Sequence, residues 1–484
     1  MSVTDERPIA VYSRHSKERK AHAIPVVYSR NVVLISTYEL GHQPFGLASP
    51  AAWLRRAGAR VTCLDLSRES LREEPVQQAD LIAFYVPMHT ATRLAVEVLP
   101  AVRKLNPRAH LCFYGLYAPV NESLLRRLGA DTILGGEFEE ALVSVLERLR
   151  RPASRAAAQP EPLVSLARQR FVAPERHDLP PLSCYAHLNH ADGKPRTVGY
   201  TEASRGCKHL CRHCPIVPVY GGRFRIVQPD VVLEDIRRQA GAGAEHITFG
   251  DPDFFNGIRH AIDIVTALHR EYPSLTYDVT IKIEHLLKHA EHLRTLGGTG
   301  CLFVTSAVEA VDDSILARLD KGHTSADFVA VVEMFRDAGL ALSPTFVAFT
   351  PWTTLEGYCE LLRRIARLDL VENVAPVQLA IRLLIPAGSR LLELREVREM
   401  VHPYDQDALV YPWAHSDPRV DELCLKIQAL VQRAQKNGDT RWAIFERVWK
   451  LAHRTAGLAV EEIPQEDVGV SRAAIPYLTE PWYC

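Results

Sequence analysis

Apolar runs of strand length alternate with segments of helical spacing from residue 31 to residue 150. The strand-like runs are 31–37, 60–66, 79–87, 109–115 and 131–136, and the helical segments are 45–59, 90–106, 120–129 and 137–150. This alternation predicts a doubly wound, Rossmann-like parallel sheet of the α/β class, with ligand at the carboxyl ends of its strands. No GxGxxG sequence follows the first run, so the pattern alone suits a nucleotide, a flavin or a corrin ring equally.

A second series of strand-like runs follows a segment rich in proline, alanine and arginine. These runs are 198–206, 245–249, 275–283, 301–309, 341–351 and 375–386, and helical segments separate them. Six parallel strands with outer helices predict a partial (β/α)6 barrel, whose site lies at the carboxyl ends of the strands. Two helices of roughly 18 residues, predicted from periodicity after residue 400, would form a helical cap.

Length and composition limit the protein's class. A chain of 484 residues exceeds one ordinary core, so we expect two domains and a small third. The formal net charge of −1 gives no electrostatic reason to expect nucleic acid or an anionic membrane as a partner. The sequence has neither an apolar run of membrane-spanning length nor the apolar region of a signal peptide, so we expect a cytoplasmic protein.

These patterns divide the chain into five segments. The expected segments are a polar leader (1–30), the Rossmann-like domain (31–150), a linker (151–195), the barrel (196–395) and a helical region with a cysteine-ended tail (396–484). Phe171, Leu179, Leu182 and Tyr185 lie in the second half of the linker, and we expect them to pack on the following domain.

Three cysteines lie within eight residues, at Cys207, Cys211 and Cys214. A structural zinc site closes its tetrahedron with a fourth ligand, so a trio favours an iron–sulfur cluster with one iron left open. His209 and His213 lie in the same loop, which keeps a Cys/His zinc knuckle as the alternative. The remaining cysteines are scattered singly, as expected of apolar thiols in a reducing compartment.

The spacing CxxxCxxC, with the aromatic His213 before its last cysteine, resembles the signature of the radical SAM enzymes. The resemblance implies a [4Fe–4S] cluster on these cysteines, an open iron that binds S-adenosylmethionine (SAM), and His213 stacked against adenine. It places further SAM contacts at the strand ends, namely Gly250 and Asp251 for the methionyl amino group, Ser306 and Glu309 for ribose and methionine, and Lys282 and Arg382 for the carboxylate or for substrate. The alternative for Asp251 is an acidic turn, and for His213 a loop histidine that faces water. For Lys282, Ser306, Glu309 and Arg382 the alternative is an ion pair lining a barrel.

The segments FGLASPAAWLRRAGARVTCLDL, ADLIAFYVPMHTATR and GADTILGGEFEEAL resemble the cobalamin-binding domain that precedes many radical SAM cores. The DxHxxG loop that supplies a cobalt ligand elsewhere is absent, so this resemblance implies cobalamin without a protein histidine on cobalt. The positions expected to face the ring are Thr37, Tyr38, Gly41, Val86, Met88, Gly115, Gly135 and Gly136. The alternative for each is an ordinary turn or core position.

The last residues, IPYLTEPWYC, are apolar and aromatic where a chain end is normally polar, so we expect them to pack against the protein. Together with GDPDFFNG, they resemble the CUAEP/CCAEP-tail radical SAM family, whose chains continue past a first cysteine with a second cysteine or selenocysteine. The resemblance implies that the chain stops at Cys484 because a selenocysteine codon was read as a stop, and that a tail thiol takes part in the reaction. A genuine short terminus with an incidental thiol is the alternative.

These observations favour a radical SAM enzyme that transfers a methyl group, with cobalamin, to an unactivated centre of a small molecule. Its reducing partner would be a flavodoxin or ferredoxin. Two alternatives remain: a cobalamin-free enzyme that transfers a SAM-derived group to a soft element held by a Cys/Sec tail, and a non-catalytic iron–sulfur sensor.

Overall fold

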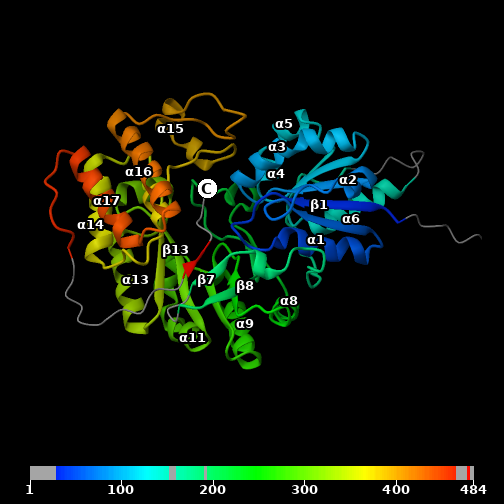
Figure 1. The fold of residues 1–484 in the computed structure, drawn as a ribbon, viewed down its shortest axis with the longest axis horizontal. Helices are drawn as coiled ribbons and strands as arrows, with labels where there is room; N and C mark the ends of the chain where they lie inside the picture. The colour runs from blue at the N-terminus through cyan, green and yellow to red at the C-terminus, as the bar shows by residue number, and fades with distance from the viewer. Residues whose placement is uncertain (1–28, 152–159, 190–192, 465–476, 480–484) are drawn as a thin grey trace, which may run out of the picture.

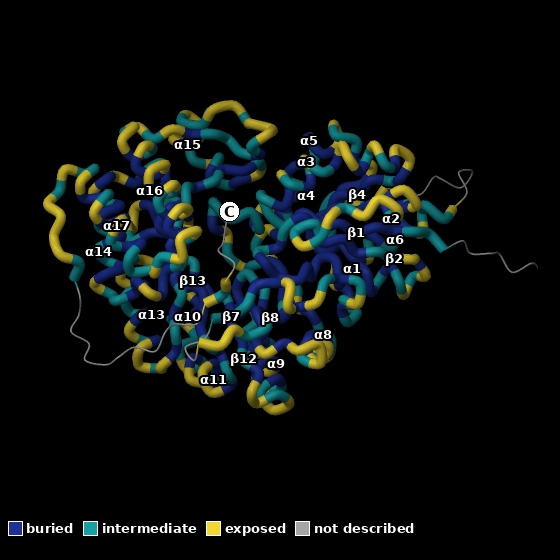
Figure 2. Tube along the Cα trace, in the orientation of Figure 1, coloured by how far each residue is buried: buried dark blue, intermediate teal, exposed yellow. Residues whose placement is uncertain are grey.

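The computed structural model describes residues 29–151, 160–189, 193–464 and 477–479. Two α/β bodies lie side by side, and helices of the C-terminal region flank the second one (Figure 1). The strands of both sheets are largely buried, and most exposed residues lie on the outer helices and loops (Figure 2). No helix within these described ranges is both long and apolar enough to cross a membrane.

The first body is a parallel sheet with strand order β2-β1-β3-β4-β5-β6. Its strands are β1 (Asn31–Ser36), β2 (Arg60–Asp65), β3 (Leu81–Tyr85), β4 (His110–Tyr114), β5 (Thr132–Gly136) and β6 (Val164–Ser165). Its helices are α1 (Phe45–Arg56), α2 (Glu73–Gln78), α3 (His89–Leu105), α4 (Tyr117–Val120), α5 (Glu122–Arg127) and α6 (Glu139–Arg150). The predicted doubly wound fold is confirmed, and the strand order reverses between β1 and β3, where open sheets of this kind bind ligands.

Helices cover both faces of this sheet because its strands are apolar on both sides. Val32 and Leu34 pack in one core with α1 and α6, whereas Val33 and Ile35 pack in the other with α2 and α3. Continuous burial of β3 and β5 is typical of parallel strands with two covered faces.

The described residues of the connecting segment pack on both bodies. Phe171 and Leu182 belong to the barrel's core, while Leu179 joins the core of the first body. The hydroxyl of Tyr185 donates to Asp65 Oδ2 at 2.8 Å, at the end of β2. The segment also contains the 3-10 helix η2 (Leu182–Cys184) and the strand β7 (His187–Asn189).

The second body is a curled half-barrel with strand order β14-β13-β12-β11-β8-β7-β15. The parallel strands are β8 (Pro195–Thr201), β11 (His246–Phe249), β12 (Thr276–Thr280), β13 (Cys301–Glu309) and β14 (Ala341–Phe346). Strand β7 pairs antiparallel with β8, and β15 (Tyr477–Leu478) pairs antiparallel with β7. The last described residues, 477–479, therefore lie along the barrel's edge, and the rest of the tail that was expected to pack lies outside the described residues.

Helices cover the outer face of the half-barrel and extend past it. They are α8 (Pro229–Gly241), α9 (Ile258–Glu271), α10 (Ile283–Lys288), α11 (Leu293–Gly298), α12 (Asp313–Leu319), α13 (Ser325–Ala338), α14 (Leu355–Arg367), α15 (Arg395–Met400), α16 (Pro418–Lys436) and α17 (Arg441–Thr455). Short 3-10 helices are η3 (Phe254–Gly257), η4 (Ala290–His292), η5 (Pro376–Leu379) and η6 (Arg390–Glu393). The two long helices predicted after residue 400 are α16 and α17.

Two of the predicted strands differ in extent from the structure. The sixth run, 375–386, starts with η5 and then pairs with the barrel through a single parallel bridge, Phe349 to Arg382. Pro376, at the first position of η5, has no N–H to give a strand ladder and fixes a φ that suits a tight turn. The run 198–206 breaks after β8, and its end forms β9 (Ser204–Gly206), which pairs antiparallel with β10 (Phe224–Ile226).

Candidate active site

The cysteine loop lies between β9 and the short helix α7 (Val217–Tyr220), near the carboxyl ends of the barrel strands. Within it, Cys214 N donates to Cys211 O at 3.2 Å, and Arg212 N donates to Leu319 O at 2.9 Å. Burial raises the pKa of Cys214 to about 12, and the thiols of Cys211 and Cys207 act in the same direction. Cys211 is buried and Cys207 and Cys214 are half-buried, so the three predicted thiols lie in one partly buried loop.

The segment after β11 wraps this loop. Asp251 accepts from Ala203 N at 2.9 Å and from Ser204 Oγ at 2.5 Å, and burial raises the pKa of its carboxyl to about 7. Asn256 Oδ1 accepts from Lys208 N at 3.1 Å. Each carboxyl oxygen of Asp251 therefore already accepts one hydrogen bond from the strand-to-loop connection, and its contact with a methionyl ammonium stays a prediction.

Gly250 is required by packing. A Cβ atom at this position would lie 1.9 Å from the hydroxyl oxygen of Tyr200. The ring of Tyr200 stacks on that of His42 from the first body, with centroids 4.7 Å apart. Gly250 therefore makes room for a contact between the two bodies, which the sequence did not indicate.

Glu309, His213 and Lys321 form a buried polar group at the end of β13. Glu309 Oε1 lies 3.1 Å from His213 Nε2 and 3.3 Å from Lys321 Nζ. Burial by itself would raise the pKa of Glu309, but Lys321 and His213 lower it to about 2. Glu309 has a φ of 71°, a left-handed conformation uncommon outside glycine, which fits a position held by its surroundings.

Lys321 is a residue of this group that the sequence analysis missed. Its side chain is almost completely buried, and its ammonium is close enough to Cys211 and Cys214 to be influenced by their charge. The only sequence signal is the turn Asp320-Lys321-Gly322 after α12, in which Asp320 and Gly322 both have positive φ.

Lys282 also reaches the cysteine loop, whereas Ser306 and Arg382 do not. Lys282 Nζ lies 3.0 Å from His209 Nδ1. Ser306 shares the face of β13 with Val304 and Val308, which pack in the core between the sheet and the helices, so it faces away from the barrel interior. Arg382 pairs with Asp421 of α16 at 2.5 Å and stacks on the Trp413 ring at 3.6 Å, which places it in the C-terminal region.

The positions predicted to face a corrin ring differ in their contacts and burial. Thr37 Oγ1 donates to Ala91 O at 2.7 Å, and the Gly41 carbonyl accepts from Ala186 N at 2.9 Å. Tyr38 and Met88 are half-buried at the ends of β1 and of the β3–α3 connection. Val86 is completely buried in the core under α3, so its predicted contact with a ring is wrong.

The three glycines predicted to face the ring contact the protein itself. A Cβ on Gly135 would lie 2.5 Å from Pro119, and one on Gly136 would lie 2.2 Å from the Ser165 carbonyl. Gly115 has a φ of 111°, and a Cβ there would lie 3.0 Å from the carbonyl oxygen of Val86. Their lack of a side chain is explained by the packing of α4, β6 and β3, without a ligand.

A buried charge cluster connects the two bodies. Arg205, two residues before Cys207, binds Glu139 through both terminal nitrogens at 2.9 and 2.7 Å, and binds Glu202 at 2.6 Å. Glu137 lies 3.5 Å from Arg205 and accepts from the Tyr220 hydroxyl at 3.0 Å. Because Glu137 directly follows β5 and Glu139 begins α6, this cluster fixes the cysteine loop against the first sheet.

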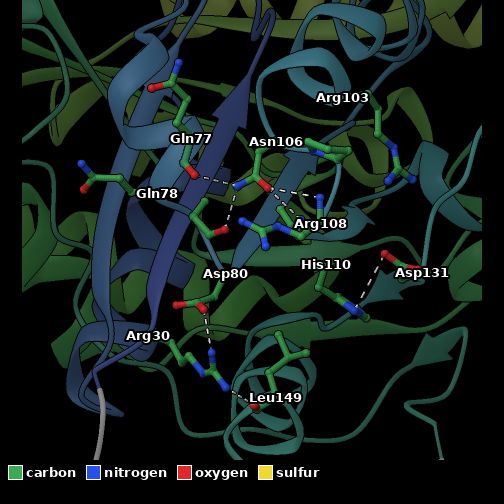
Figure 3. A pocket seen from close by; sticks show the side chains of 13 residues that line it. Arg30, Gln77, Gln78, Asp80, Arg103, Asn106, Arg108, His110, Asp131 and Leu149 are labelled. Atoms are coloured by element: carbon green, nitrogen blue, oxygen red, sulfur yellow. Dashed lines mark hydrogen bonds and ion pairs between the residues drawn. The ribbon is translucent and has the colours of Figure 1, made fainter.

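A polar cavity of about 590 Å³ lies at the amino ends of β1, β3, β4 and β5 (Figure 3). Arg30 pairs there with Asp80 at 2.6 Å, and Asn106 donates to the carbonyls of Val76 and Ala79. The cavity opens on the edge opposite the carboxyl ends of the strands, and none of the predicted site residues lines it.

Comparison with known proteins finds a superfamily model that matches the barrel. Residues 201–362, about a third of the chain, match the model of the radical SAM superfamily. The chain is 24% identical over 344 residues to the hopanoid C-3 methylase of Methylococcus capsulatus; the match covers 68% of this chain and 64% of that protein.

Two solved structures share the arrangement of both bodies. The cobalamin-dependent SAM radical enzyme OxsB, with aqua-cobalamin bound, matches with a TM-score of 0.65 and 14% identity over 84% of this chain and 67% of its own. The radical SAM methyltransferase TsrM of Kitasatospora setae, with tryptophan and a SAM analogue bound, matches with a TM-score of 0.59 and 17% identity over 76% of each chain. These likenesses establish the fold, a half-barrel preceded by a doubly wound domain.

Proposed function

We propose that this protein is a radical SAM enzyme whose cluster is held by Cys207, Cys211 and Cys214. The observation that carries the proposal is a partly buried loop with these three thiols, beside a buried ammonium and near the carboxyl ends of the barrel strands. Three soft thiolates without a fourth suit a [4Fe–4S] cluster with one open iron. The donor set therefore fits the cluster.

The residues around the loop can bind and orient SAM. When bound, the cluster and SAM supply an electron and a 5′-deoxyadenosyl radical. The ammonium groups of Lys282 and Lys321 can pair with the carboxylate of SAM, and Glu309 can accept hydrogen bonds from its hydroxyl or ammonium groups. Glu309 also fixes the ring of His213, the residue proposed to stack on adenine.

We propose cobalamin as a second cofactor, held at the carboxyl end of the first sheet. Ser36 Oγ and Glu39 Oε2 are buried there, at the end of β1, without a hydrogen-bond partner among the described residues. This is the point where the strand order reverses, and unpaired polar atoms there are suited to the amide groups of a large ligand. The residues proposed to contact cobalamin there are Thr37, Tyr38 and Gly41 in the loop after β1, and Met88 beside that loop.

The proposed reaction is methyl transfer to an unactivated centre of a small molecule, as in the hopanoid C-3 methylase that resembles the chain. A flavodoxin or ferredoxin would supply the electron, and the cytoplasm would keep the cluster reduced. The chain spans 64% of that methylase. The reaction, the electron donor and the compartment are therefore proposals for this protein.

The tail chemistry of the CUAEP/CCAEP family is a second candidate. It is favoured by the pairing of Tyr477 and Leu478 with β7, which anchors the chain near its end to the barrel. Cys484 lies outside the described residues. In this candidate, the tail thiol delivers a soft element and no cobalamin is needed. Sequencing of the DNA downstream tests the tail, because a frame without an Ala-Glu-Pro continuation removes it.

Reductive cleavage of SAM tests the proposed class. The anaerobically reconstituted protein should form 5′-deoxyadenosine on reduction, and alanine at Cys207, Cys211 or Cys214 should reduce the product to background. Cys184→Ala is the matched control, because Cys184 is an exposed thiol outside the loop. Equal product from any of the three loop variants would refute the class, and a wild type without SAM cleavage would leave the iron–sulfur sensor.

Cobalamin binding is tested separately by the absorbance of protein after gel filtration with hydroxocobalamin. The wild type should retain one equivalent, and Glu39→Ala should lower the retained fraction. No retention by the wild type would favour the cobalamin-free alternative.

A further inference from the structure

Four metal-ligating side chains converge beside the cysteine loop, from three parts of the barrel. They are Cys207 and His209 of the loop, Asp253 after β11 and His285 of α10. The ligand atoms of Cys207, His209 and Asp253 all lie within 4.8 Å of one another. Asp253 Oδ2 is at the centre, 3.4 Å from His209 Nε2 and 2.7 Å from His285 Nδ1.

Three of these atoms have unused bonding capacity. His209 Nε2, Asp253 Oδ2 and His285 Nδ1 are buried, and none of them makes a hydrogen bond of acceptable geometry with any residue that the structure describes. Their contacts are therefore at ion-pair distance but poorly directed. These three atoms pair with one another at ion-pair distance, and a cation between them would use the bonding capacity that the poorly directed contacts leave.

We propose that the cluster-free protein binds one Zn²⁺ at Cys207, His209, Asp253 and His285. A thiolate, two imidazoles and a carboxylate are ligands that zinc accepts in a tetrahedral site. The ligand atoms of such a site lie about 3.3–3.6 Å apart, so the side chains of Cys207 and His285 would draw closer to Asp253 and His209 to complete it. Binding releases the thiol proton of Cys207 to solvent and changes no oxidation state.

The surroundings hold two of these ligands in place. Asp253 Oδ1 accepts from Phe255 N at 3.2 Å at the start of η3, which fixes the carboxylate and leaves Oδ2 for the metal. With zinc on Nε2, the Nδ1–H of His209 needs an acceptor, and Glu284 Oε2 lies 3.4 Å from it. Lys282 Nζ, 3.0 Å from the same Nδ1, would then turn from the ring to Glu284, with which it already pairs at 3.3 Å. A carboxylate behind a histidine ligand is a common support in metal sites.

This site differs from a zinc knuckle built within the loop. His213, the second histidine of the loop, binds Glu309 at 3.1 Å and is not part of the group. Cys211 and Cys214 are not needed, but Cys207 is shared with the proposed cluster. Zinc and the cluster therefore exclude each other, so zinc held here blocks cluster assembly until it is removed.

Zinc titration of the full-length, metal-free protein tests the site, with a chromophoric chelator as competitor under anaerobic conditions. Wild type and Cys211→Ala/Cys214→Ala should each bind one Zn²⁺ with similar affinity. His285→Ala and Asp253→Asn should each weaken binding at least about 100-fold, because each removes a ligand. His213→Gln is the matched control and should bind like wild type.

Loss of zinc in Cys211→Ala/Cys214→Ala would overturn the proposal, because the metal would then sit on the cysteine trio. Unchanged binding in both His285→Ala and Asp253→Asn would also overturn it. Circular dichroism checks that these variants fold, and the absorbance of Co²⁺ in the Cys211→Ala/Cys214→Ala protein provides a second measurement, with thiolate-to-cobalt bands expected only while Cys207 is present.

A competition experiment tests the shared ligand. One equivalent of Zn²⁺ added before iron and sulfide should lower the cluster absorbance of wild type, and His285→Ala should escape this inhibition. Inhibition of equal size in both proteins would contradict a shared site. The zinc site does not depend on SAM chemistry, so its failure would leave SAM cleavage by zinc-free wild type unaffected.

Discussion

The carboxyl ends of the two parallel sheets are filled in different ways. In the barrel, Glu309 and Lys282 reach out from the strand ends to histidines of the cysteine loop. In the first sheet, Pro119 and the Ser165 carbonyl occupy the space beside the glycines of β5. A strand end therefore becomes a site only where a loop brings ligand-type groups to it, and position in a parallel sheet is not sufficient.

Arg205 joins these two ends, so its removal should have the largest effect on stability. Arg205→Met leaves Glu137, Glu139 and Glu202 without their cation, and the free energy of unfolding should fall by about 4 kcal/mol. Denaturant unfolding measures the change. Arg205→Met/Glu139→Gln should recover part of it, whereas a loss below about 1 kcal/mol would show that the cluster does not hold the two bodies together.

Glu309→Gln tests the barrel end alone. The pKa of Glu309 is lowered to about 2, so its ionised form stabilises the fold above pH 4.5, and this contribution disappears as the pH falls toward 2. At pH 7 the variant should be less stable by about 3 kcal/mol. Thermal unfolding at several pH values measures the difference, which should shrink below pH 4.5. A difference independent of pH would contradict the assignment.

Glu137→Gln tests the carboxyl end of the first sheet, where the pH dependence of stability should have the opposite sign. Burial raises the pKa of Glu137 to about 7, so the folded protein holds a proton there that the unfolded chain releases near pH 4.5. This contribution to stability is present below pH 4.5 and should decrease by about 2 kcal/mol between pH 5 and 8. Denaturant unfolding across this range should give a flatter profile for the variant than for wild type. Parallel profiles would exclude Glu137 as the titrating group.

Arg30→Gln provides the smallest expected effect, at the sheet edge opposite both sites. Arg30 and Asp80 are each about one-third exposed, and exposed ion pairs contribute less than about 1 kcal/mol. The unfolding midpoint should hardly change, and cluster absorbance after reconstitution should equal that of wild type. A loss of cluster absorbance would mean that the cavity at this edge is coupled to the barrel.

The fold could be predicted from the sequence because its signals are local and repeated. The apolar runs of β1 to β5 and of β8 to β14 are short-range patterns, and they were found in order. The error at residues 375–386 arose because an apolar run does not reveal whether its backbone pairs, and Pro376 starts a 3-10 helix there. The short helix α2 was missed because only Val76 of its six residues is buried.

Site residues can be predicted from the sequence only where spacing along the chain defines the chemistry. The cysteine trio lies in one loop, so its spacing alone suggests a cluster, which stays a prediction. Lys321 and His285 come from separate elements, and nothing near them in the sequence indicates that they approach the loop. Ser306 was misplaced because the side of a strand that faces the barrel is decided by the packing of its neighbours.

The sequence by itself determined two α/β bodies and one loop of three thiols, because periodicity and short spacings depend only on residues that are close together along the chain. The tertiary structure alone decided which charges meet: Arg205 with Glu139, Lys321 with Glu309, and His285 with Asp253. The physical reason is that a buried charge needs a partner within a few ångströms, and residues far apart in sequence become such partners only when the elements pack.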